Sequence, residues 1–81
     1  MRKLPRDLSG EDLCRALKAL GYEATRQTGS HIRLTTTEEG QHHATIPRHG
    51  SLRVGTVAAI LAAVADHFSI SRLELQERLF G

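Results

Sequence analysis

The segment Ser9–Leu34 reads SGEDLCRALKALGYEATRQTGSHIRL, and within it the apolar period changes from that of a helix to that of a strand. Ser9, with Asp12 three residues later, is a variant of the capping box that begins a helix. Apolar residues then recur at helical spacing, at Leu13, Ala16, Leu17 and Leu20. Gly21 is placed where a glycine ends a helix, so this segment predicts one amphipathic helix followed by extended chain.

Three strands are predicted after Gly21. In the first, Tyr22, Ala24 and Arg26 alternate with Glu23, Thr25 and Gln27, which places Arg26 on the same face of the strand as Tyr22. Turns at 28–30 and 37–40 bound a second strand that begins at His31. A third runs from about Gln41 to Ile46, where Pro47 ends it because proline cannot donate to a ladder.

Tight turns make these strands an antiparallel meander with one face covered by helices. The apolar residues Ile32, Leu34, Ala44 and Ile46 require the covered face. Parity then places the alternating residues on the open face, namely His31, Arg33, Thr35, His43 and Thr45. His31 is therefore expected on an exposed sheet surface beside an arginine.

Two further helices are predicted. One starts near Thr56 and is rich in alanine; the other is capped by Ser71 with Glu74. The fold class is therefore α+β, a three-stranded antiparallel sheet with helices on one face plus a short C-terminal helix. We expect a single domain over 1–81, with its core at about 9–65 and a helical extension at about 68–81.

Composition limits the functional classes only weakly. The formal net charge of +2 does not by itself indicate nucleic-acid binding. One cysteine excludes an internal disulfide. Arg2, Lys3 and Arg6 precede no apolar run, and the longest apolar run, Val57–Ala65, is too short to cross a bilayer. We expect a cytoplasmic protein without a signal peptide or a membrane partner.

Three motifs carry a resemblance to a known family: GYEATRQTGSHIRL at 21–34, TIPRHG at 45–50 and GTVAAIL at 55–61. In this order and spacing the chain resembles the HicA, or YcfA-like, toxin family over roughly Ser9 to Val64. The resemblance implies a double-stranded-RNA-binding-like α-β-β-β-α fold. It also implies an mRNA-cleaving ribonuclease that is neutralised by a HicB-type antitoxin, with His31 as its functional histidine.

RNA carries its own nucleophile, the 2′-OH, so such a ribonuclease needs a base and positive charge at the phosphate. His31 suits the first role and Arg33 the second, and this scheme requires neither a metal nor a cofactor. Gly29 lets an RNA backbone approach closely or simply makes the turn; Ser30 donates to a phosphate or only shapes the turn. His43 is expected on the open face near His31, as a second acid or an RNA contact, and Arg48 is a candidate contact for RNA or the antitoxin. For each, a solvated side chain is the alternative.

Adjacent strand residues point to opposite faces, so His42 and His43 are not expected to share a metal ion. Arg26, on the other face by parity, is expected to cover the edge of the core with its stem. Two other functions stay open: an RNA-binding module that does not cut, and a protein-interaction domain whose basic face docks an acidic partner. Oligomeric state is left undetermined by the sequence.

Overall fold

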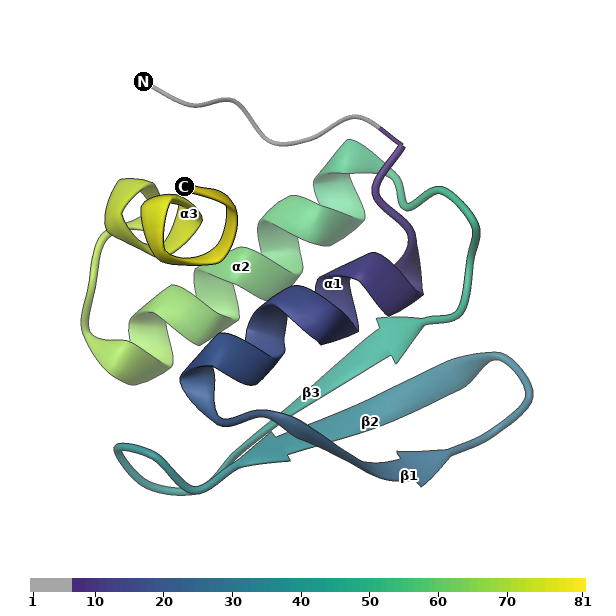
Figure 1. Cartoon of the computed structure of the whole chain (residues 1–81), viewed down its shortest axis with the longest axis horizontal. Coiled ribbons are helices and arrows are strands. Elements are labelled where there is room, and N and C mark those ends of the chain that lie inside the picture. The colour runs from purple at the N-terminus through teal and green to yellow at the C-terminus, as the bar shows by residue number, and fades with distance from the viewer. Residues whose placement is uncertain (1–6) are drawn as a thin grey trace.

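The computed structural model describes residues 7–81, in which helices are layered on one three-stranded sheet (Figure 1). Along the chain the elements are α1 (Gly10–Leu17), the 3₁₀ turn η1 (Lys18–Leu20), β1 (Glu23–Gln27), β2 (His31–Thr36), β3 (His42–Pro47), α2 (Val54–Phe68) and α3 (Arg72–Phe80). This order confirms the α+β prediction and the double-stranded-RNA-binding-like α-β-β-β-α arrangement with an added C-terminal helix. Arg2, Lys3 and Arg6, which bear on the predicted absence of a signal peptide, lie outside the described residues.

The predicted local signals bound the helical segment formed by α1 and η1, at its start and at its end. The hydroxyl of Ser9 accepts from the N–H of Asp12 at 2.9 Å, and the Asp12 carboxylate accepts from the N–H of Ser9 at 3.1 Å. These bonds satisfy donors that have no partner within the helix, and the Ser9 N–H lowers the pKa of Asp12. After η1, Gly21 takes a φ of 83°, the left-handed conformation that ends a helix at low cost for glycine.

The sheet has the order β1-β2-β3, and both strand pairs are antiparallel. In the ladder between β2 and β3, Ile32 lies opposite Ile46. Burial alternates along β2, where Ile32 and Leu34 are buried while His31 and Arg33 are exposed. The predicted parity of β2 is therefore confirmed, and β3 follows it through their register.

The helices lie together on one face of the sheet and enclose the core with it (Figure 1). The fully buried side chains come from every layer and include Leu13, Leu17, Tyr22, Leu34, Ile46, Leu61, Val64 and Leu75. Leu75 belongs to α3, so the C-terminal extension packs against the core. α2 begins at Val54, two residues before the start predicted near Thr56.

The strand β1 differs from its neighbours because all five of its residues are exposed. Its backbone ladder with β2 holds it in the sheet, while its side chains add nothing to the buried core. Packing therefore places no demand on the side-chain types along β1.

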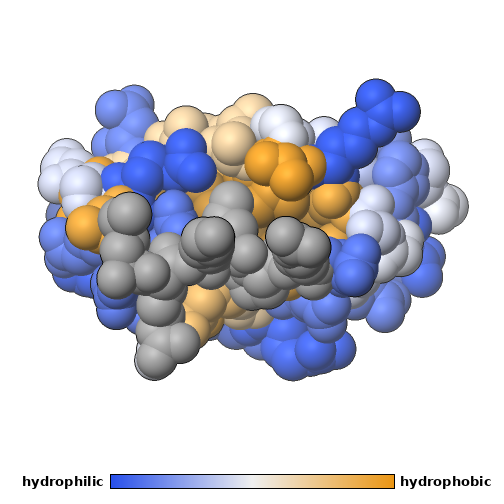
Figure 2. Space-filling model, turned by 90° about the horizontal axis from the view of Figure 1, so that it is seen from above, coloured by the Kyte–Doolittle hydropathy of each residue, from blue (hydrophilic) through white to orange (hydrophobic). Residues whose placement is uncertain are grey.

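Seen from the helical side, apolar residues gather along the middle of the surface and hydrophilic residues lie toward both ends (Figure 2). Across residues 7–81 the exposed large apolar side chains are Val54 and Leu73, from α2 and α3. In the same residues no single helix is long and apolar enough to cross a membrane. Only α2 and α3 taken together reach that length and composition, and they are bent by 103°.

An aromatic cluster closes the core where the sheet meets the C-terminal end of α2. The ring of Tyr22 is fully buried, and its hydroxyl lies 2.6 Å from Nδ1 of His42. The imidazoles of His42 and His67 stack with centroids 4.6 Å apart, and Nε2 of His67 donates to the carbonyl of Glu38 at 2.9 Å. Burial lowers the pKa of His42, as do the His67 and His43 charges, and burial raises the pKa of Tyr22 to about 12. The cluster therefore favours uncharged rings.

Because the pKa of His42 is lowered on folding, the unfolded chain takes up a proton at His42 before the folded chain does. We expect the free energy of unfolding to fall as the pH drops from about 6.5, the value for an unperturbed histidine, through the lower folded pKa. Thermal unfolding followed between pH 7.5 and pH 5 measures this slope. His42→Phe should flatten the slope, whereas His49→Phe in the exposed loop should leave it as in the wild type. Equal slopes for wild type and His42→Phe would contradict this account.

Candidate functional site

The outer face of the sheet carries the polar residues that the sequence placed there. His31 and Arg33 stand on β2, and His43 and Thr45 stand on β3; all four are exposed. The register sets Arg33 opposite Thr45, while Ile32 and Ile46 turn toward the helices. Packing of the apolar residues therefore holds these polar side chains in water on one surface.

His31 is the first residue of β2 and is anchored by the preceding turn. Its N–H donates to Oγ1 of Thr28 at 3.2 Å, and its carbonyl accepts from the Thr28 N–H at 2.9 Å. The Ser30 hydroxyl lies 3.0 Å from Nδ1 of the ring. Because Nδ1 is engaged by Ser30, Nε2 is the ring nitrogen offered to a ligand. An imidazole held in this way leaves one ring nitrogen free to accept a hydrogen bond from a ligand or to donate one to it.

Gly29 lies at the tip of the same turn, and the backbone does not require glycine there. Its φ lies outside the left-handed region, and a Cβ built on it would meet no atom within 4 Å. The turn would therefore accept an alanine without strain. A role for Gly29 must come from what approaches it, and the space beside His31 is open for such an approach.

A β-bulge in β1 changes the expected position of Arg26. The register with β2 shifts between Ala24 and Arg26, so that Ala24 lies opposite Leu34 while Arg26 lies opposite Arg33. The prediction that Arg26 shares the face of Tyr22 and covers the core edge is therefore wrong. The extra residue reverses the alternation, and Arg26 stands on the outer face with Arg33.

The bulge is held by the side chain of its extra residue, Thr25. The Thr25 hydroxyl lies 3.3 Å from the carbonyl oxygen of Arg33 and 2.8 Å from the hydroxyl of Thr35. These contacts link β1 to β2 on the outer face. Sequence alternation carries no mark of a bulge, so Arg26 was missed as a residue of this face.

His43 is also fixed on the outer face, at some distance from His31. Its Nδ1 lies 2.8 Å from the Thr35 hydroxyl, so Thr25, Thr35 and His43 form a chain of contacts across all three strands. In the register His43 pairs with Thr35, four residues along β2 from His31. At 3.3 Å per residue this is about 13 Å. The two imidazoles therefore do not meet at one phosphate group, and the expectation that His43 lies close enough to His31 to act as a second acid is wrong.

Arg48 lies beside the His31 turn through its backbone rather than its side chain. The Arg48 N–H donates to the carbonyl of Ser30 at 2.9 Å. Its guanidinium lies 3.8 Å from the Glu11 carboxylate at the start of α1, in an exposed pair. Both groups line a hollow with Ser9, His49 and Gly50. The structure thus directs the Arg48 side chain toward α1.

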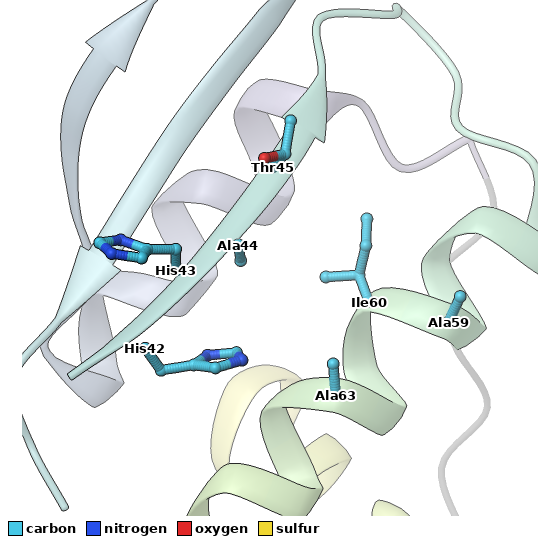
Figure 3. Close-up of a pocket in the computed structure, with 7 residues that line it drawn as sticks. All are labelled: His42, His43, Ala44, Thr45, Ala59, Ile60 and Ala63. Atoms are coloured by element: carbon cyan, nitrogen blue, oxygen red, sulfur yellow. The ribbon is translucent and has the colours of Figure 1, made fainter. Parts of the chain in front are cut away.

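A groove of about 240 Å³ runs between β3 and α2 (Figure 3). Its lining is apolar at Ala44, Ala59, Ile60 and Ala63, and polar at His42, His43 and Thr45. His42 points toward α2, while His43 points to the other side of β3 (Figure 3). Across residues 7–81 no group of three or more His, Cys, Asp or Glu side chains is placed to hold a metal ion.

Comparison with known proteins gives a family match, which covers most of the chain. A family model described as "HicA toxin of bacterial toxin-antitoxin" matches residues 10–65, which run from the start of α1 almost to the end of α2. The matched range includes the whole sheet and every residue of its outer face. No curated protein and no solved structure gives a significant match.

Proposed function

Because this chain belongs to the HicA toxin family of bacterial toxin–antitoxin systems, we propose that it is a toxin that cleaves mRNA on the outer face of its sheet. The observation that carries the proposal is His31, which is exposed, held at Nδ1 by Ser30 and two residues from Arg33 on the same face. None of these side chains belongs to the hydrophobic core.

The proposed reaction uses the substrate's own nucleophile. His31 takes the proton of a 2′-OH, the resulting oxygen attacks the adjacent phosphorus, and the 5′ oxygen of the next nucleotide leaves. The leaving oxygen takes a proton from water, because the face is open to solvent, and the hydroxide so formed takes the proton from His31 and regenerates it. The products are a 2′,3′-cyclic phosphate and a 5′-hydroxyl end. Arg33 stabilises the charge on the phosphate oxygens, and the reaction proceeds without a metal or other cofactor.

The remaining outer-face residues bind RNA away from the reacting bond. His43, about 13 Å along the strand direction from His31, contacts a neighbouring part of the same strand. Gly29 and Ser30 border the reacting phosphate, and Arg48 adds positive charge at the end of β3. A HicB-type antitoxin neutralises the toxin by covering the outer face in the cytoplasm, which excludes RNA directly.

A second function is favoured by the distance between the two histidines. A module of the same fold that binds RNA without cutting it needs no paired acid and base, and His43 lies too far from His31 to complete such a pair. In that case the arginines matter more than His31. The two functions therefore differ in which residue, when removed, abolishes the effect on the cell.

We expect induced expression of the wild type to arrest growth and His31→Ala to relieve the arrest. Loss of general acid–base catalysis should lower the RNA cleavage rate by about 10²–10⁴-fold while leaving most of the affinity. His49→Ala, a histidine in the exposed loop after β3, is the matched control and should arrest growth as the wild type does. Circular dichroism checks that each variant folds. A folded His31→Ala protein that still arrests growth would favour the non-cleaving module.

Gly29→Ala tests whether an RNA backbone approaches Gly29 closely or whether this glycine only forms the turn. Since the added methyl group meets no atom within 4 Å, we expect the free energy of unfolding to change by less than about 0.5 kcal/mol. If an RNA backbone approaches here, the methyl group weakens RNA binding by up to about tenfold, or 1.4 kcal/mol. Urea unfolding and fluorescence anisotropy with a labelled RNA measure the two quantities. Unchanged affinity would show that Gly29 only forms the turn.

A further inference from the structure

Two arginines face each other across neighbouring strands on the outer face. The bulge at Thr25 sets Arg26 directly opposite Arg33, so that their Cβ atoms are about 4.5–5.5 Å apart. Like charges in this position destabilise a sheet, whereas an acid opposite an arginine would stabilise it. The folded protein therefore holds an unfavourable pair on a strand that contributes nothing to the core.

This pair has no counter-charge within the described chain. The salt bridges of residues 7–81 join Arg15 to Asp12, Arg48 to Glu11 and Arg78 to Glu74. None involves Arg26 or Arg33, and both of these residues are exposed. Two guanidinium groups, each with a planar set of donors, are thus offered together to an anion from solution.

The pair also lies beside the proposed catalytic histidine. Arg33 is two residues from His31 on the same face of β2, about 6.6 Å along the strand. Arg26 is brought into this row by the contacts of Thr25 with Arg33 and Thr35. An anion bound between the arginines is therefore within reach of a group that His31 deprotonates.

We infer that Arg26 and Arg33 form a clamp for one phosphodiester group of single-stranded RNA, and that the bulge at Thr25 exists to position Arg26 in it. The inference rests on the proposed function, because it takes RNA as the substrate. A phosphodiester has two non-bridging oxygens, so each can accept from a different guanidinium group.

The clamp makes folding and binding respond in opposite directions to one substitution. Arg26→Gln removes a like-charge contact, so at low salt its melting temperature should be equal to or higher than that of the wild type. The same change should weaken RNA binding about tenfold. A purely structural role for Arg26 would instead lower the melting temperature and leave binding unchanged.

The test uses full-length protein carrying His31→Ala, so that RNA is bound without being cut. The binding of an unstructured labelled RNA is measured by anisotropy over a range of salt concentrations for this parent, for added Arg26→Gln or Arg33→Gln, and for both together. We expect each single change to reduce the salt slope by about 0.7, as one lost phosphate contact does on a single strand. The double variant should lose less than the sum of the two, because both arginines hold the same phosphate.

Arg53→Gln is the matched control, because Arg53 is an exposed arginine at the N-cap of α2. The start of α2 lies away from the sheet (Figure 1). It should bind RNA as the parent does. If Arg26→Gln also binds as the parent does, the clamp is wrong while RNA binding stands. If the parent binds no RNA, the proposed function fails and the clamp with it. If the parent binds polyglutamate in preference to RNA, an acidic protein is the ligand and the RNA clamp is overturned.

Discussion

A three-stranded sheet that is covered on one face has to bury every second side chain of its strands under the helices. The rest of this molecule depends on this separation between a buried and an exposed face. Leu34 and Ile46 are buried under the helices, so their neighbours along each strand must point into water. His31 and Arg33 stand on the outer face because Ile32 and Leu34 are needed in the core. The geometry of the outer face is therefore as well defined as the packing beneath it.

The parts of the fold that local chemistry determines could be predicted from the sequence. The capping box of Ser9, the stop at Gly21 and the parity of β2 each depend on neighbours along the chain or on strongly apolar residues. β1 lacks such residues, so nothing in its alternation fixes which side is buried. Its bulge is held by contacts of Thr25 with residues of another strand, which no pattern within β1 records. Arg26 was consequently placed on the wrong face.

The candidate site shows the same limit. That His31 and Arg33 share a surface follows from strand parity, which the sequence contains. The distance between His31 and His43 depends on how β2 and β3 are paired, and parity alone does not supply it. The direction of the Arg48 side chain depends on Glu11, which only the folded chain brings near. Shared faces are thus accessible from the sequence, whereas distances and partners across elements are not.

The exposure of every residue on β1 has a consequence for how such a protein changes over generations. A substitution on this strand removes no buried contact, so the fold tolerates many residue types there, whereas a change at Leu34 or Ile46 is purged for its effect on packing. The strand that carries Arg26 is thus the part of the sheet where the fold itself sets the fewest limits on residue type. Lineages can vary this exposed strand while inheriting the same core.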